Sequence, residues 1–180
     1  MIGRLFRLPP IVYFILAPLV LALGVAGMIS SNSNDAAKAA ALSHAAPESV
    51  ALQDVTSGET GNDYNEIVLL AQADVYNTMI REKTKRGRVR SSKTFVPLYA
   101  TDATDLNGPV VAVIEVDRTM RDADFEKLYD SDGPAGPIFK INGVLEDGGS
   151  YASGQAFEGI KEMAETVYTV KPFLAGREKG

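Results

Sequence analysis

One uncharged segment near the N-terminus constrains this chain more than any other feature. Residues 11–29 read IVYFILAPLVLALGVAGMI, 19 positions without a charged side chain. At a rise of about 1.5 Å per residue, a helix of this length spans roughly the 30 Å hydrocarbon layer of a bilayer. Membrane helices tolerate an internal proline such as Pro18. We therefore predict a single transmembrane anchor, whose anchoring residues include Ile11, Phe14, Leu16, Leu19, Leu21, Leu23 and Ile29.

The charges beside this segment predict its orientation. Arg4 and Arg7 precede it, whereas Lys38 is the only basic residue among the fifty that follow. Short flanks rich in Lys and Arg stay in the cytoplasm. We therefore expect residues 1–10 to be cytoplasmic and the C-terminal domain to be exported, into the periplasm if the cell is bacterial.

A cleaved signal peptide is the alternative for the same segment. Gly24, Ala26 and Gly27 are small enough for a signal peptidase site. The apolar run continues past that site, however, and exceeds the roughly 7 to 15 residues of a usual signal core. This favours an uncleaved anchor, and under either interpretation the rest of the chain is exported.

The composition narrows the chemistry available to the remaining residues. A chain of 180 residues holds one ordinary domain plus an appendage. It has no cysteine, which excludes disulfides, thiolate nucleophiles and zinc sites built on Cys. The single histidine, His44, lies in a low-complexity stretch, so neither a catalytic triad nor a multi-histidine metal site is expected. We predict no catalytic residue, no metal and no cofactor.

The chain after the anchor divides into two parts. Residues 30–63 are rich in Ser, Asn, Ala, Gly and acidic residues without a sustained period, which predicts a flexible tether. Residues 64–180 form the predicted exported domain. Alternating apolar residues, apolar runs and turn signals there predict strands at 66–80, 93–101, 110–116, 137–146 and 167–174, and helices at 120–130 and from Ser153 to about Val167.

These elements predict an α+β domain that is mostly antiparallel, in the order β-β-β-α-β-α-β. The order is compatible with a small OB-like barrel and also with an open sheet that carries two helices on one face. Pro97 places its strand at an edge or beside a bulge. The strand 110–116 is expected to be the most buried, and the first helix to begin at a capping box of Thr119 and Asp122.

The strongest local signal is a basic stretch between the first two predicted strands. Residues 81–93 read REKTKRGRVRSSK and carry seven basic residues and one acidic residue, a formal charge of +6. The rest of residues 34–180 has nine basic and 22 acidic residues, a charge of −13. Gly87 lies in the middle, so we expect the tip of a β-hairpin. The candidate partner-binding residues are Arg81, Lys83, Lys85, Arg86, Arg88, Arg90 and Lys93.

Three interpretations compete for this basic tip. It is a solvated hairpin whose charges prevent edge pairing, a docking surface for an acidic protein partner or anionic head groups, or a nucleic-acid ribbon. An acidic, exported domain disfavours nucleic acid. We therefore predict a non-enzymatic membrane accessory or scaffold protein, in the manner of a subunit of an envelope complex, that docks a protein partner.

A small-ligand or lipid-binding domain is the main alternative function. It would use a concave sheet face with the aromatic residues Tyr76, Phe95 and Tyr99. An enzyme restricted to carboxylates ranks below it, since the acidic cluster is better explained as a solvated helix surface. That cluster contains Asp117, Asp122, Asp124, Glu126, Asp130 and Asp132.

Two further motifs are weak. Asp130 and Asp132 resemble part of a calcium loop, but Leu128 would occupy the first ligand position of an EF-hand, so an ordinary turn is favoured. Gly148, Gly149 and Gly154 lie in a loop whose backbone N–H groups would suit an anion, but its acidic residues repel phosphate. We expect a simple connection there.

Overall fold

The described part of the chain is built mostly from β-strands, as the alternating pattern of its sequence indicates. The computed structural model describes residues 43–55, 65–146 and 156–177. The strands are β1 (Ser49–Ala51), β2 (Glu66–Ala73), β3 (Met79–Lys85), β4 (Arg88–Tyr99), β5 (Val110–Val116), β6 (Tyr129–Asp132), β7 (Pro137–Glu146) and β8 (Met163–Pro172). The helical elements are the 3₁₀ turns η2 (Leu52–Asp54) and η3 (Val75–Asn77) and the helix α2 (Asp122–Leu128).

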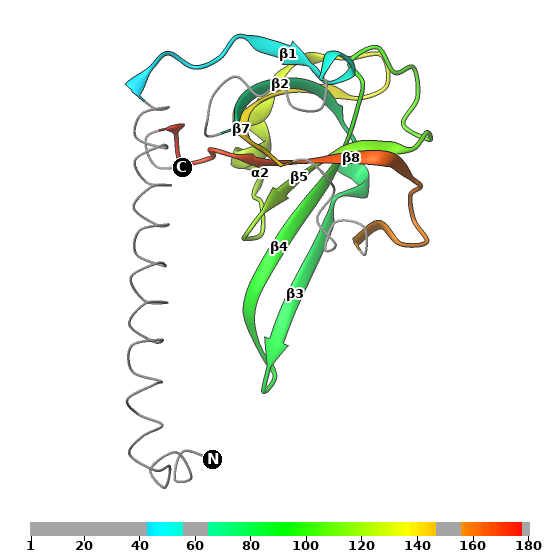
Figure 1. The fold of residues 1–180 in the computed structure, drawn as a ribbon. Helices are drawn as coiled ribbons and strands as arrows, with labels where there is room; N and C mark the ends of the chain where they lie inside the picture. The colour runs from blue at the N-terminus through cyan, green and yellow to red at the C-terminus, as the bar shows by residue number, and fades with distance from the viewer. Residues whose placement is uncertain (1–42, 56–64, 147–155, 178–180) are drawn as a thin grey trace, which may run out of the picture. The chain divides into compact units, whose positions relative to one another are not determined.

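Five of these strands close into a ring (Figure 1). Strand β2 pairs antiparallel with β4 at one end and with β7 along its length. Strand β5 pairs antiparallel with β4 and parallel with β8, and β7 pairs antiparallel with β8. The remaining strands extend this ring: β1 lies parallel to β2, β3 pairs with β4, and β6 pairs with β7.

The inside of the ring is the main hydrophobic core. Alternate residues of each strand face inward because successive side chains of a strand point to opposite faces. On β2, for example, Ile67, Leu69 and Ala71 all belong to this core. It also receives Leu128 from α2, and Leu52 from η2 is only 2% exposed.

A second apolar cluster lies outside the ring, on β4 and β5. It contains Phe95 and Tyr99 from β4 and Val113 from β5. Ala156 and Phe157, from the segment before β8, pack against them, and Phe157 is fully buried. The outer face of these two strands is therefore covered by the chain itself.

The fully buried amide of Gln72 joins the loops at one end of the ring. Its Nε2 atom donates hydrogen bonds to three backbone carbonyls, those of Ala100, Thr101 and Ala103. Its Oε1 atom accepts from the backbone N–H groups of Ala135 and Gly136, at 2.8 and 3.0 Å. Two loops that are remote in sequence are thus held by one side chain.

The fold confirms a small sheet-rich domain, and two predicted strands are confirmed to the residue, at 110–116 and 137–146. The prediction of one long strand over 66–80 is wrong, because β2 ends at Ala73. The side chain of Asp74 accepts hydrogen bonds from Asn77, which holds residues 75–77 in a 3₁₀ turn. Such local side-chain bonds compete with the sheet ladder.

The helix predictions also need correction. Helix α2 starts at Asp122, and its start is capped by Asp124, whose carboxylate accepts from the backbone N–H of Arg121, rather than by Thr119 and Asp122. It ends at Leu128, so Tyr129 begins β6 instead of closing the helix. The second predicted helix is wrong from Met163 onward, where β8 begins and pairs with β5 and β7. Ser153 and the glycines at 148, 149 and 154 lie outside the described residues.

Part of the predicted tether packs against the closed ring of strands, which we call the barrel. Ser49–Ala51 pairs with β2. At the start of β2, the fully buried Glu66 receives two hydrogen bonds from Arg177, at 2.5 and 2.8 Å, and Arg177 also donates to the backbone carbonyl of His44. The Arg177 side chain therefore links the segment before β1 to β2, through a hydrogen bond and an ion pair.

The predicted anchor, residues 11–29, lies outside the described residues. Within the part of the chain that the structure describes, no helix has the length and apolar character needed to cross a membrane.

Candidate docking hairpin

The β3–β4 hairpin carries the basic stretch and extends beyond the ring (Figure 1). Its turn consists of Arg86 and Gly87, which both have positive φ, at 54° and 71°. Two residues with positive φ form the type I′ turn that matches the twist of paired strands. Glycine adopts this conformation freely, so Gly87 at the expected middle of the stretch explains the tight turn.

The strand register sorts most of the hairpin's basic residues onto one face. Directly paired residues share a face, and faces alternate along each strand. Lys83 pairs with Ser91 and Lys85 with Arg88, while Arg90 is the extra residue of a bulge. We call this side the cationic face; its basic residues are Arg81, Lys83, Lys85, Arg88 and Lys93.

The opposite face of the hairpin is nearly uncharged. It carries Ile80, Thr84 and Val89, and Glu82 is the one charged residue that the strand pairing assigns to it. Ile80 is 49% exposed and Val89 is 53% exposed. The hairpin is therefore two-sided, with lysine and arginine on one side and exposed aliphatic groups on the other.

The base of the hairpin is held by hydroxyl groups. Thr94 donates to the backbone carbonyl of Arg118 at 2.7 Å and accepts from the backbone N–H of Met120 at 3.0 Å. Thr119 donates to Ser92 at 3.2 Å. These bonds attach the hairpin to the segment before α2, so the hairpin leaves the barrel from a hydrogen-bonded base.

Lys93 differs from the other predicted docking residues. Its ammonium group forms ion pairs with Glu115 and, at 2.8 Å, with Asp117. Hydrogen bonds to Asp117 and then to Glu115 raise the pKa of Lys93 above its usual value. The charge of Lys93 is therefore balanced at the base of the hairpin, whereas Lys83, Lys85, Arg86, Arg88 and Arg90 are exposed toward the tip.

Pro97 lies in a strand of the ring rather than in an edge strand. Its strand pairs with β3 as far as Phe95, with β2 from Leu98, and with β5 along the other side. Pro97 thus occupies the point where β4 changes from one neighbour to the next. A residue without an N–H donor is tolerated where no ladder partner needs that donor.

The aromatic residues proposed for ligand binding do not share a surface. Phe95 and Tyr99 are buried in the outer apolar cluster, whereas Tyr76 is fully exposed on η3. The ammonium of Lys161 lies 5.5 Å from the centre of the Tyr99 ring and 2.9 Å from a carboxylate oxygen of Asp74. Burial raises the pKa of the Tyr99 hydroxyl. Phe95, Tyr99 and Lys161 therefore contribute to packing within the domain.

Asp124, the buried member of the acidic cluster, has a structural role. It is 1% exposed and accepts two hydrogen bonds from the guanidinium of Arg118, at 2.6 and 2.9 Å. Those bonds, with a further one from the backbone of Arg121, hold the pKa of Asp124 far below its usual range. The exposed Asp130 and Asp132 accept from neighbouring side chains. Among the described residues, no group of three or more acidic or histidine side chains converges as a metal site.

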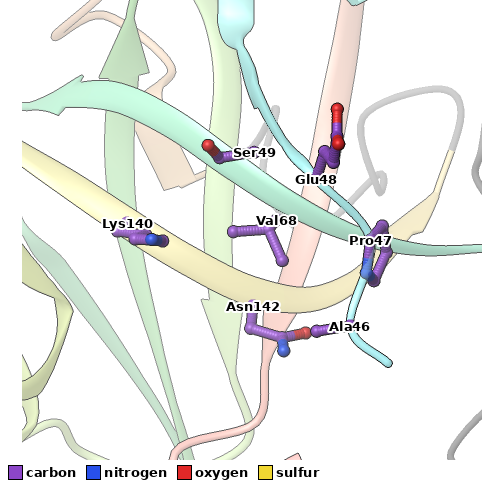
Figure 2. Close-up of a pocket in the computed structure, with 7 residues that line it drawn as sticks. All are labelled: Ala46, Pro47, Glu48, Ser49, Val68, Lys140 and Asn142. Atoms are coloured by element: carbon purple, nitrogen blue, oxygen red, sulfur yellow. The ribbon is translucent and has the colours of Figure 1, made fainter. Parts of the chain in front are cut away.

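An open groove that the sequence did not indicate lies on β7. It has a volume of about 660 Å³ and runs between Ala46–Ser49 on one side and Lys140 and Asn142 on the other, with Val68 between them (Figure 2). The Oδ1 atom of Asn142 is buried without a hydrogen-bond partner among the described residues. The sequence signal that could have indicated this groove is the pair of polar residues, Lys140 and Asn142, at alternate positions of an otherwise apolar strand.

Comparison with known proteins adds no relative. The chain matches no family model, no curated protein and no solved structure.

Proposed function

We propose that this chain is a membrane-anchored, non-enzymatic accessory or scaffold protein whose exported domain docks an acidic protein partner. The observation that carries the proposal is the hairpin itself. Its basic residues from Lys83 to Arg90 are exposed, and the hairpin extends away from a closed barrel (Figure 1). Charges arranged in this way steer an oppositely charged partner and form charge-assisted hydrogen bonds with it.

The strand order supports a binding role for the hairpin. The ring order has an antiparallel meander, a parallel closing pair and a helix before β7. This order supports an OB-like barrel, in which β2 and β3 together would act as one interrupted first strand. Barrels of this kind often bind oligonucleotides or oligosaccharides through the loop between their first two strands, so this loop is a common binding element. In this chain that loop is the basic tip.

The predicted anchor indicates on which side of a membrane this docking surface would act. A transmembrane helix at residues 11–29 with Arg4 and Arg7 on its cytoplasmic side would hold the domain at the outer side of the membrane. A domain anchored in this way meets other envelope proteins at high effective concentration. A scaffold or assembly role follows from anchoring combined with one charged docking surface.

The groove on β7 supports the second candidate, a small-ligand or lipid-binding domain. The groove lining carries one cation, Lys140, and one carboxylate, Glu48, so a small polar ligand that pairs with both charges fits best. We expect such a ligand to raise the melting temperature of the domain. Lys140→Ala would remove that rise, whereas the hairpin variants described below would leave it unchanged.

The experiment for the main proposal starts from the full-length chain in its native membranes. The tagged protein is extracted in mild detergent at low and moderate salt, and co-eluting proteins are sized and identified by mass spectrometry. We expect a stoichiometric partner whose recovery falls as salt rises. A lone monomer of intact mass, indifferent to salt, would overturn the docking function.

The hairpin is tested in the same extraction. Lys85→Glu/Arg86→Glu/Arg88→Glu reverses three exposed charges at the tip, and we expect the partner to be lost. The control Lys127→Glu reverses an exposed charge on α2 that does not line the groove, and we expect the partner to be retained. Recovery of the partner with the hairpin variant would contradict the proposal.

A further inference from the structure

We infer that the acidic partner docks as an extended strand along β3, with acidic side chains at every second position. This inference rests on the proposed function and specifies the partner's chemistry. Strand β3 is paired with β4 along one side, and no other strand in the described part of the chain pairs with its second side. An unpaired side of a strand is a template for an added strand.

The two free edges of the hairpin are not equivalent. Strand β4 also lacks a second neighbour near the tip, since its pairing with β5 begins only at Thr94. On β4, however, the extra residue Arg90 breaks the regular spacing, and bulges of this kind blunt an edge. Strand β3 runs for seven residues without an inserted residue. The regular edge of β3 is therefore the better template.

The side chains beside this edge determine the sequence it accepts. Lys83 and Lys85 lie two residues apart on the cationic face, about 6.8 Å along the strand. An added strand has the same repeat, so an acidic residue at every second position meets this face. The positions between them meet Ile80 and Thr84, where β-branched or aliphatic residues fit. Glu82 on that second face repels acidic residues there.

A strand-like peptide explains more of the hairpin than a generic polyanion does. A nucleic acid or a polyphosphate presents a comparable charge repeat, but it has no backbone N–H and C=O groups for the edge of β3. It also makes no use of the exposed aliphatic group of Ile80 on β3. The chemistry that matches both faces is a peptide that alternates acidic and β-branched residues.

The first test compares two peptides of identical composition against the full-length chain in mild detergent. One peptide alternates Asp with Val or Thr, and the other gathers its Asp residues at one end. We expect fluorescence anisotropy at low salt to show at least tenfold tighter binding of the alternating peptide. Equal affinities, or equally tight binding of single-stranded DNA of the same charge, would overturn the inference.

The second test separates strand pairing from charge attraction. Two versions of the alternating peptide carry N-methyl groups on every second backbone nitrogen, one version on each edge. Only one peptide edge can face β3, so we expect one version to lose binding and the other to keep it. Reversing the peptide direction exchanges the two edges, so a third version carries N-methyl groups on every backbone nitrogen. Retention of that version would show that side chains alone carry the contact and would overturn strand addition.

Variants of the chain complete the design. Lys83→Glu/Lys85→Glu is expected to lose the alternating acidic peptide and to gain a peptide with Lys in place of Asp. The control Lys127→Glu, which reverses an exposed charge on α2, keeps the original preference. If hairpin variants lose the native partner but the peptides of the first test bind alike, this inference fails while the docking function stands. If the native partner is retained, the docking function fails first.

Discussion

The barrel and the hairpin use charged and polar residues in opposite ways. In the barrel and the adjoining α2, buried carboxylates are paired with arginines, Glu66 with Arg177 and Asp124 with Arg118. Toward the tip of the hairpin, Lys85 and Arg88 are exposed next to one another in the register. Charged side chains therefore stabilise the fold in the first region and are exposed to solvent in the second.

The difference follows from the cost of burial. A buried polar group that loses its partner destabilises a protein by several kcal/mol, whereas most exposed substitutions change stability by less than about 0.5 kcal/mol. The barrel is therefore expected to be sensitive to changes in its polar residues. The hairpin can collect basic residues without weakening the barrel, and this leaves its sequence open to selection for binding.

The largest effect should come from Gln72→Glu. The new carboxylate would face three backbone carbonyls to which Nε2 now donates, so we expect a loss of about 4 kcal/mol or more in the free energy of unfolding. Urea unfolding of the full-length chain in mild detergent measures it. The matched control is Gln53→Glu, an exposed glutamine whose Oε1 accepts from Thr101 and would still do so. A comparable loss in both variants would contradict the role of the buried amide.

Arg177→Met should have the next largest effect. It leaves the fully buried Glu66 without its cation, and we expect a loss of about 3 kcal/mol. Because that loss comes from an uncompensated charge, the double variant Glu66→Gln/Arg177→Met should recover part of it. Equal stability of the single and double variants, in the same unfolding assay, would show that the buried charge is not the cause.

Asp124→Asn should be smaller and dependent on pH. The pKa of Asp124 is lowered in the folded state by Arg118 and the backbone of Arg121, so its carboxylate stabilises the fold above the unfolded pKa of about 3.9. We expect a loss of about 2 kcal/mol at pH 7, because the Arg118 side chain is 42% exposed and its charge is partly screened. The gap between wild type and variant should shrink as the pH falls below about 4. A gap independent of pH between 2 and 7 would contradict this account.

The smallest effect on stability should come from the hairpin. Because every replaced side chain is exposed, Lys85→Glu/Arg86→Glu/Arg88→Glu should change the free energy of unfolding by less than about 1 kcal/mol. The same urea titration measures it beside Gln72→Glu. A loss as large as that of the barrel variant would show that these charges stabilise the fold, and the contrast between the two regions would be lost.

The elements predicted best from the sequence are those with strong local signals. Strand β5 is a β-branched run that follows a turn signal, and β7 follows Gly136, so both were located to the residue. The hairpin was predicted from its charges and from Gly87. Its division into two faces was not, because Arg90 shifts the register by one residue and only the paired strands reveal that shift.

The remaining features depend on contacts between distant residues. Strand β2 looks continuous with β3 in the sequence, and the break depends on bonds between Asp74 and Asn77. Met163 and Ala164 fit a helical spacing, yet pairing with β5 and contact with the outer cluster place them in β8. Ring closure through β2 and β7 likewise has no local signature.

Hydrogen–deuterium exchange of the full-length chain, alone and with its co-purified partner, tests the central claim most directly. The account predicts that the partner slows exchange in residues 79–93, with β3 protected most, while the barrel strands exchange as before. Protection of the groove near Lys140 and Asn142, with an unchanged hairpin, would contradict it.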